Sequence, residues 1–191
     1  MGHDLRNPLA VAKGNAELLG DTCDDPALEA IDRALDRMDA LIENLLLLAR
    51  EGSLTGVHEP VTLADVSAAC WDTIVTAEAT LRLDTDRTIW ADPMRAKQLL
   101  ENLFSNAIRH GGDAVTVTVG DLSDGFYVED DGVGIPADAR EQVFDAGHST
   151  ATGGTGFGLS IVAQVADAHG WHVHLTESDH GGARFEFTGV T

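Results

Sequence analysis

Residues 1–50 carry apolar side chains at alternating steps of three and four, the spacing of a helix with one apolar seam. The seam recurs in two segments, at Leu5, Leu9, Ala12, Ala16 and Leu19 and then at Leu28, Ile31, Leu35, Met38, Ile42, Leu45 and Ala49. Gly20 and Pro26 mark the break between the segments, and Gly52 follows the second. The pattern predicts an antiparallel helical hairpin over residues 1–52. Because two helices cannot enclose a core, we expect the hairpin to form half of a dimeric four-helix bundle.

Beyond residue 60 the pattern changes to a mixture of helical and strand-like spacings. Gly56 to Pro60 has the composition of a linker, which we place at residues 53–60. Helical spacing covers three segments, Leu63–Glu78, Pro93–His110 and Leu159–His169. Strand-like alternation covers Thr88–Ala91, Ala114–Gly120 and Gly125–Glu129. It also covers a closing hairpin, Trp171–Leu175 and Phe185–Phe187, which turns at Gly181 and Gly182. No strand–helix–strand repeat is present in the sequence. Residues 61–191 are therefore predicted to form a second domain, an α+β domain of two layers.

The aromatic and histidine residues of this second domain are most simply structural. Phe104, Trp90 and Trp171 are expected in its core. Four histidines suggest zinc at first sight, namely His169, His172, His174 and His180. However, His172 and His174 fall on the polar face of an alternating strand, and the spacing of the four is not that of a zinc site. We therefore predict no metal site there.

The composition adds an unusually negative charge. The chain of 191 residues has 32 Asp and Glu against 12 Lys and Arg, which gives a net charge of −20 at pH 7. Such a field repels nucleic acids and anionic membrane surfaces, so neither is expected as a partner. A hydrophobic fraction of 43% is too high for a disordered acidic chain. We interpret the acidic surface as an adaptation to high salt, which predicts a halophilic, archaeal source.

Other features of the sequence favour a cytoplasmic location. No apolar run reaches the ~18 residues of a membrane span, and no signal-peptide pattern opens the chain. Cys23 and Cys70 form neither a C-x-x-C pair nor a disulfide framework, and we give neither a role. We expect any sensor domain or membrane anchor to lie upstream of this chain.

Two motifs in the second domain place polar side chains where a ligand could bind. Asn102 and Asn106 are one helical turn apart, so they share a face of their predicted helix. Asp130 directly follows a predicted strand and opens the segment Asp-Asp-Gly-Val-Gly-Ile-Pro. Its glycines, Gly132 and Gly134, allow the backbone to approach a ligand that the carboxylate binds. Each motif alone is weak evidence, because solvated asparagines and tight turns are common.

A third motif is the glycine-rich segment with Gly154, Gly156 and Gly158, which runs into the helix Leu159–His169. Free N–H groups at a helix N-terminus suit a phosphate, although this motif too is weak alone. In their order along the chain, the three motifs resemble the N, G1 and G2 boxes of the ATPase superfamily of gyrase, heat-shock chaperones, histidine kinases and mismatch-repair proteins. The resemblance covers roughly residues 61–190. It implies a Bergerat-type α/β two-layer sandwich that binds ATP with Mg²⁺.

Further motifs favour the histidine kinase branch of this superfamily. Asn102–His110 follows the kinase form of the N box, and Val143–Thr150 resembles the F box of the nucleotide lid. His3–Leu9, with the sequence His-Asp-Leu-Arg-Asn-Pro-Leu, resembles the H box of sensor histidine kinases, in which the histidine accepts the phosphoryl group. The resemblance thus implies the catalytic core of a two-component sensor histidine kinase. Residues 1–52 would be its dimerisation and phosphotransfer hairpin, and residues 61–191 its ATP-binding domain.

The resemblance also implies a role for each matched residue of the ATP-binding domain. Asp130 would accept a hydrogen bond from the adenine amino group, which favours ATP over GTP. Asn106 would coordinate Mg²⁺, and Asn102 would support the metal and phosphate site. The other matched positions are Arg109 for phosphate, His110 for stacking on adenine, Gly132 and Gly134 for the base pocket, and Gly154, Gly156, Gly158 and Leu159 for the lid.

In the hairpin, the resemblance makes His3 the phosphoryl acceptor. Neutral His3 would attack the γ-phosphorus through one nitrogen while Asp4 holds the proton of the other. The phosphohistidine would then donate to an aspartate of a response-regulator receiver domain, and Asn7 would orient a water that dephosphorylates this receiver. Two alternatives stay open. One is an anti-sigma-factor-like serine kinase of the same ATPase fold, which His3 and Asp4 disfavour, and the other is a degenerate nucleotide binder that transfers nothing.

The net charge of −20 predicts that stability rises with salt. At low ionic strength the acidic side chains repel one another over a Debye length of about 30 Å, which shrinks to about 3 Å at 1 M salt. We expect the melting temperature and the affinity for an anionic nucleotide to increase between about 0.05 M and about 3 M KCl. A thermal melt and a nucleotide titration across this range measure both. A flat or falling melting temperature would contradict the halophilic interpretation.

Overall fold

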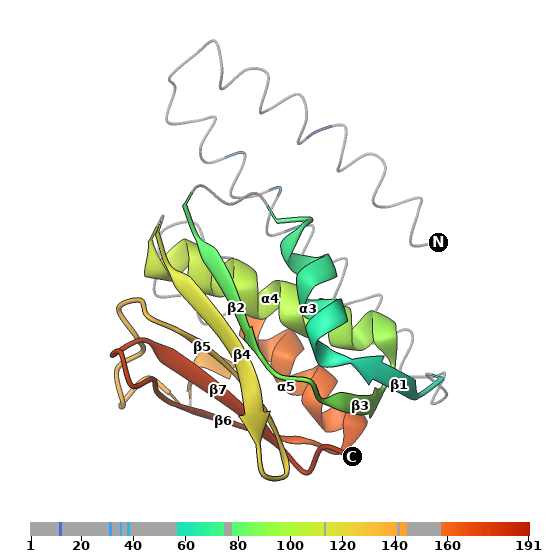
Figure 1. Cartoon of the computed structure of the whole chain (residues 1–191). Helices are drawn as coiled ribbons and strands as arrows, with labels where there is room; N and C mark the ends of the chain where they lie inside the picture. Colours follow the sequence, from blue (N-terminus) through green and yellow to red (C-terminus); the bar gives the residue numbers. More distant parts are fainter. Residues whose placement is uncertain are drawn as a thin grey trace. The chain divides into compact units, whose positions relative to one another are not determined.

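The computed structural model describes residues 57–74, 78–112, 114–140, 142–144 and 158–191, together with Ala12, Ile31, Leu35 and Met38 (Figure 1). These four residues are helical, in agreement with the helical seam. The rest of the predicted hairpin lies outside the described residues, as do His3, Asp4, Asn7, Gly154 and Gly156. Most described residues belong to one compact unit, Gly56–His148 with Gly158–Thr191.

A five-stranded sheet forms one layer of this unit, with the strand order β2-β4-β5-β7-β6. Its strands are β2 (Thr80–Asp84), β4 (Thr116–Leu122), β5 (Gly125–Asp130), β6 (His172–Glu177) and β7 (Ala183–Thr188). All neighbouring pairs are antiparallel except β2 and β4, which run parallel. A separate two-stranded sheet pairs β1 (Glu59–Thr62) with β3 (Thr88–Ala91). The order of the strands confirms a mixed α+β domain.

Three helices form the second layer, on one face of the five-stranded sheet (Figure 1). They are α3 (Leu63–Trp71), α4 (Pro93–Gly111) and α5 (Gly158–His169), and a short 3-10 turn, η1 (Gln142–Phe144), packs near α5. None of the helices in the described part of the chain is long and apolar enough to cross a membrane. The result is the two-layer sandwich that the sequence predicts.

The core lies between these layers because the strands alternate apolar and polar side chains. Strand β7 shows the alternation clearly, since Phe185 and Phe187 are buried whereas Arg184 and Glu186 lie on the opposite face. Phe187 stacks on Phe126 of β5 with the ring centroids 4.7 Å apart. The helices contribute the other half of the core, chiefly Leu99, Leu100, Leu103, Phe104, Val162 and Val165. This core fixes the sheet and helix ends that carry the candidate site.

Helix α4 begins where the sequence predicts it. Asp92 caps it, since its Oδ1 accepts from the backbone N–H groups of Met94 at 2.9 Å and Arg95 at 3.3 Å. Pro93 occupies the first turn, where a missing N–H costs nothing. Gly112 follows the last helical residue with a φ of 95°, a conformation that glycine adopts readily. Both ends of the helix are thus encoded locally.

Other expectations were wrong in detail. Helix α3 ends at Trp71 rather than Glu78. The residues that follow are rich in β-branched side chains, and Thr73 Oγ1 donates to the carbonyl of Cys70 at 2.7 Å, which competes with helix continuation. Strand β2 was not predicted, and β1 begins at Glu59, inside the predicted linker.

Among the three aromatic residues expected in the core, Phe104 and Trp171 are buried but Trp90 is 52% exposed. It lies on the outer side of β3 opposite Pro60, because its neighbours Ile89 and Ala91 take the buried positions. Cys70 is fully buried on α3, and burial raises the pKa of its thiol to about 11. A protonated, buried thiol is unreactive.

His169, the last residue of α5, joins this helix to the start of α4. Its Nε2 accepts from the backbone N–H of Asp92 at 3.0 Å, and its Nδ1 lies 2.7 Å from the carbonyl of Val165. The ring stacks on Trp171 at 4.3 Å and meets His58 edge-on at 5.0 Å. Burial lowers the pKa of His169, and the charges of His58 and Arg95 lower it further against the opposing effects of the Val165 carbonyl and Asp92. The fold therefore holds His169 in its neutral form.

The hydrogen bond from Asp92 N–H to neutral His169 predicts a loss of stability below neutral pH. Because folding lowers the pKa of His169, the neutral ring contributes to the free energy of unfolding above the unfolded pKa of about 6.5. This contribution disappears as the pH falls below that value. Protonation would place an N–H donor against the N–H of Asp92. We expect the melting temperature to fall more steeply between about pH 7.5 and 5.5 in the natural protein than in His169→Gln, which does not titrate. Parallel slopes for the two proteins would contradict this role of His169.

Candidate active site

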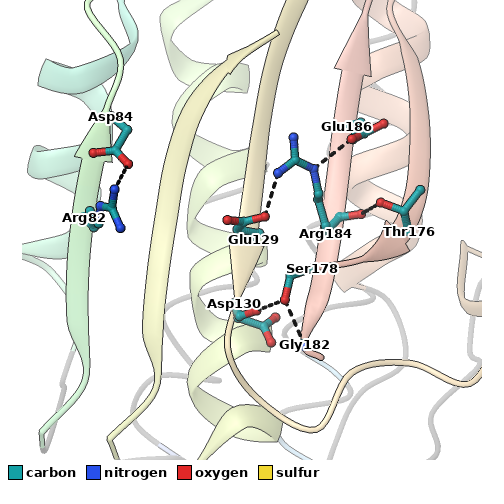
Figure 2. Close-up of polar contacts among 9 residues, drawn as sticks. All are labelled: Arg82, Asp84, Glu129, Asp130, Thr176, Ser178, Gly182, Arg184 and Glu186. Atoms are coloured by element: carbon teal, nitrogen blue, oxygen red, sulfur yellow. Dashed lines mark hydrogen bonds and ion pairs between the residues drawn. The ribbon is translucent and has the colours of Figure 1, made fainter. Parts of the chain in front are cut away.

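Asp130 lies at the end of β5, and the residue is only 9% exposed (Figure 2). Its Oδ1 accepts two backbone N–H groups, from Gly132 at 3.0 Å and from Ala183 at 3.1 Å. These bonds hold the carboxylate in one orientation. Its second oxygen, Oδ2, accepts no hydrogen bond from the residues that the structure describes. Asp130 therefore presents a fixed acceptor for a donor from outside the protein.

The surroundings of Asp130 disfavour its charge. Burial raises the pKa of this carboxyl above its usual value, and the neighbouring charge of Asp131 adds to the increase. The N–H groups of Ala183 and Gly132 and the charge of His110 oppose this effect without cancelling it. A buried carboxylate whose pKa is raised is typical of functional sites, because a residue selected only for stability would avoid the cost.

The two glycines predicted to shape the pocket are required by close contacts. A Cβ on Gly132 would lie 2.5 Å from Cα of Gly111 at the end of α4. Gly134 has a φ of +68°, and a Cβ there would lie 2.5 Å from the carbonyl oxygen of Gly181. The segment after β5 is thus held between the end of α4 and the turn between β6 and β7.

Asn102 and Asn106 lie half-buried on α4, one turn apart, as predicted. Nδ2 of Asn102 donates to the carbonyl of Gln98 at 2.8 Å, which leaves its Oδ1 on the side of α5. A Cβ on Gly158, the first residue of α5, would lie 3.2 Å from this Oδ1. The structure therefore brings part of the N motif and the end of the glycine-rich motif together. Leu159, the next residue, packs against the core.

Arg109 and His110 are exposed in the last turn of α4. Partial burial of its ring lowers the pKa of His110, as does the charge of Arg109, whereas the charge of Asp130 raises it. The end of α4 therefore lies close to the end of β5, as the approach of Gly132 to Gly111 also shows. A neutral imidazole here presents a flat ring beside a buried acceptor.

Arg109 differs from the other basic residues of the described part of the chain. Each of the others forms an ion pair with a carboxylate: Arg82 with Asp84, Arg87 with Asp121, Arg95 with Asp92, Lys97 with Glu101, Arg140 with Glu177, and Arg184 with Glu129 and Glu186. Arg109 has no carboxylate partner among the described residues. Because the described residues offer it no carboxylate, we take the Arg109 guanidinium as a candidate contact for an anionic ligand.

The structure places several of the predicted residues near one another. Gly132 and His110 lie close to the Asp130 carboxylate, Gly134 lies against the turn between β6 and β7, and Asn102 lies beside Gly158. The sequence predicted the turn between β6 and β7 but not that Ala183, the residue after this turn, donates its N–H to Asp130. The pair Gly181 and Gly182 signalled a turn there, but nothing local showed that the turn reaches Asp130. In the F-motif region, Val143 is buried and Phe144 meets Phe185 edge-on at 6.4 Å, whereas residues 145–157 lie outside the described residues.

Comparison with protein families matches both parts of the chain. Residues 91–189 match the family model described as histidine kinase-, DNA gyrase B-, and HSP90-like ATPase. Residues 1–54 match the His Kinase A (phospho-acceptor) domain. Among curated proteins, the chain is 32% identical to the signal transduction histidine-protein kinase AfsQ2 of Streptomyces coelicolor, over 97% of this chain and 39% of that protein. It is 33% identical to the sensor protein RstB of Escherichia coli, over 98% of this chain and 47% of that protein. The chain thus spans less than half the length of these relatives.

Solved structures agree with these matches. Full-length ShkA in complex with AMPPNP has a TM-score of 0.63 and 28% identity, over 100% of this chain and 44% of that chain. The catalytic domain of histidine kinase ThkA has a TM-score of 0.58 and 27% identity, over 68% of this chain and 93% of that chain. The mycobacterial sensor histidine kinase MprB, at 23% identity and a TM-score of 0.61 over 70% of this chain and 97% of that chain, supports the fold alone.

The burial of Asp130 predicts that Asp130→Asn stabilises the fold. Because the pKa of Asp130 is raised in the folded state, its ionised form lowers stability at any pH above that pKa. Asparagine retains an oxygen for the N–H groups of Gly132 and Ala183 but carries no charge. We expect its melting temperature at pH 7.5 to be higher than that of the natural protein, with the difference shrinking at acidic pH. Asp124→Asn, at an exposed position in the turn between β4 and β5, is the matched control and should show no gain. A lower melting temperature for Asp130→Asn would contradict the cost that we assign to its charge.

Proposed function

Since the chain belongs to the histidine kinases that combine a phospho-acceptor domain with a gyrase B- and HSP90-like ATPase domain, we propose that it transfers the γ-phosphoryl group of ATP to His3. The observation that carries this proposal is the buried carboxylate of Asp130, with Oδ1 satisfied by the backbone and Oδ2 available to a ligand. In this proposal, residues 1–52 dimerise and carry His3, residues 53–60 link the two domains, and residues 61–191 bind ATP. The match of residues 1–54 to a phospho-acceptor domain supports the first assignment.

The base of ATP would be recognised by Asp130. Oδ2 accepts a hydrogen bond from the exocyclic amino group of adenine, and this charge-assisted bond is stronger than one between neutral groups. Guanine presents a carbonyl oxygen at the corresponding position, which a carboxylate repels, so ATP is favoured over GTP. The neutral ring of His110 stacks on the base, while Gly132 and Gly134 let the backbone lie close to it. The electrostatic interaction between His110 and Asp130 supports their acting on the same base.

The phosphates of ATP would lie along the polar face of α4. Amide oxygens are suitable ligands for Mg²⁺. We assign the coordination of Mg²⁺ to the amide oxygen of Asn106, and we assign to Asn102 a supporting contact with the metal and phosphate site. When bound, this ion neutralises charge on the β- and γ-phosphates. Arg109 contributes a positive charge to the phosphates, as the lack of a carboxylate partner in the described part of the chain supports. The lid assignments, Gly154, Gly156, Gly158 and Leu159, rest on the motif, and Gly158 lies next to Asn102.

The transfer step needs no acid or base beyond the hairpin residues themselves. One ring nitrogen of neutral His3 bonds to the γ-phosphorus as the bond to the β–γ bridging oxygen breaks, and ADP leaves with the electron pair. Asp4 holds the proton of the other nitrogen and stabilises the charge that develops on the ring. Asn102 offers no carboxylate to activate water, so ATP is conserved for His3. The phosphoryl group then passes to an aspartate of a receiver domain, and Asn7 orients water for its later hydrolysis.

Radiolabelled ATP with Mg²⁺ should label this protein at His3. Phosphohistidine contains a P–N bond, so we expect the label to be lost in acid and kept in alkali. His3→Gln should remove all of the label yet bind ATP as the natural protein does, because His3 lies outside the domain that binds the nucleotide. Label that survives in His3→Gln would exclude His3 as acceptor. An alkali-labile, acid-stable label would instead indicate the serine kinase alternative, and ATP binding without any label would indicate a binder that transfers nothing.

A further inference from the structure

Ser178 is a buried polar residue that the sequence analysis did not single out. It directly follows β6 and is 5% exposed. Its hydroxyl uses both of its hydrogen-bonding capacities: Oγ donates to the backbone carbonyl of Asp130 at 2.7 Å and accepts from the N–H of Gly182 at 2.9 Å (Figure 2). Ser178 therefore connects the end of β5 to the turn between β6 and β7.

The turn itself is closed by the backbone of the same serine. Its N–H donates to the carbonyl of Gly182 at 2.9 Å, and its carbonyl accepts from the N–H of Gly181 at 3.0 Å. This arrangement places the next residue, Ala183, so that its N–H donates to Oδ1 of Asp130 at 3.1 Å. Gly182 lies so close to Asp130 that any Cβ would overlap the Asp130 backbone. One side of the Asp130 carboxylate is thus fixed by a turn that the Ser178 hydroxyl holds in place.

Other contacts hold the strands themselves in register without Ser178. Arg184 on β7 pairs with Glu129 on β5 at 2.7 Å and with Glu186 at 2.8 Å (Figure 2). The Arg184 guanidinium also lies 3.7 Å from the centre of the Tyr127 ring. These contacts lie on the outer face of the sheet, beside the ladder of β5 and β7. Loss of the Ser178 hydroxyl is therefore expected to act on the turn and on Asp130 rather than on the whole sheet.

We propose that Ser178 is a positioning residue for nucleobase specificity, because its hydroxyl fixes the β6–β7 turn that orients the Asp130 carboxylate toward the amino group of the base. This inference rests on the proposed role of Asp130 in adenine recognition. Ser178 does not itself touch the base. It acts through the N–H of Ala183, which occupies Oδ1 and so leaves Oδ2 as the oxygen presented to the ligand.

The test compares the affinities for ATP and for purine riboside triphosphate, which lacks the amino group at C6, by titration with Mg²⁺. The natural protein should bind ATP about tenfold to a hundredfold more tightly, the value of one charge-assisted hydrogen bond. In Ser178→Ala we expect this ratio to fall by at least about fivefold, through loss of ATP affinity with little change for the analogue. Ser178→Cys has a side chain of similar size that donates only weakly, so its ATP-to-analogue affinity ratio should also fall. This variant provides the test if Ser178→Ala folds poorly.

Two comparisons distinguish positioning from a general structural effect. Ser67→Ala is the matched control, since Ser67 is fully buried on α3 and its hydroxyl has no hydrogen-bond partner in the described part of the protein. It should leave the ratio unchanged. In the Asp130→Asn background, Ser178→Ala should cost no further ATP affinity, because the two residues act through one contact.

The outcomes separate this inference from the function on which it rests. If Asp130→Asn lowers the ratio but folded Ser178→Cys keeps it, or loses affinity for both nucleotides equally, the positioning role is wrong and the adenine role of Asp130 stands. If Asp130→Asn leaves the ratio unchanged, the adenine role and the positioning role both fail. Neither result depends on the labelling of His3, because only binding is measured.

Discussion

The hydrogen bonds to Oδ1 of Asp130 are the constraint on which the rest of this domain depends. They come from Gly132, two residues further along the chain, and from Ala183, the first residue of the neighbouring strand β7. A carboxylate on a residue that is only 9% exposed needs such donors, because burial alone favours its neutral form. The same donors give it direction. Stability favours an Asp130 carboxyl with all its acceptors satisfied, whereas recognition needs one oxygen left for the ligand. The fold meets both requirements, because both backbone N–H groups donate to Oδ1 and none of the described residues donates to Oδ2.

The surrounding architecture can be understood as the support for this arrangement. The pairing of β5 with β7 places Ala183 near Asp130. Helix α4 ends against Gly132, in the segment that follows β5. The packing is tight enough that Gly132 faces Gly111 without room for a methyl group between them. Three segments that are distant in the sequence thus meet at one carboxylate. A small displacement of any of them would change the direction in which Oδ2 points.

Features set by local sequence were predicted well, whereas those set by long-range contacts were not. Helix α4 has its cap and its terminating glycine within its own segment, and the Asp130 motif follows its strand directly. Strand β2, by contrast, is an edge strand with mostly exposed side chains, and it is stabilised by parallel pairing with β4. Trp90 is exposed because its neighbours on β3 occupy the buried face, which an isolated four-residue strand does not reveal. Ser178 contacts Asp130 across 48 residues, so no local pattern could connect the two.

The Arg109 guanidinium, which has no carboxylate partner in the part of the chain that the structure describes, affects the kinetics of ligand capture. The net charge of −20 repels an anion, yet Arg109 carries a positive charge in the last turn of α4, which attracts an approaching nucleotide toward the candidate site. Added salt weakens the general repulsion and the local attraction together. The association rate constant therefore reflects two effects with opposite salt dependence: repulsion by the acidic surface, whose loss raises the rate, and attraction by Arg109, whose loss lowers it. Their balance depends on how much closer the ligand comes to Arg109 than to the surrounding carboxylates.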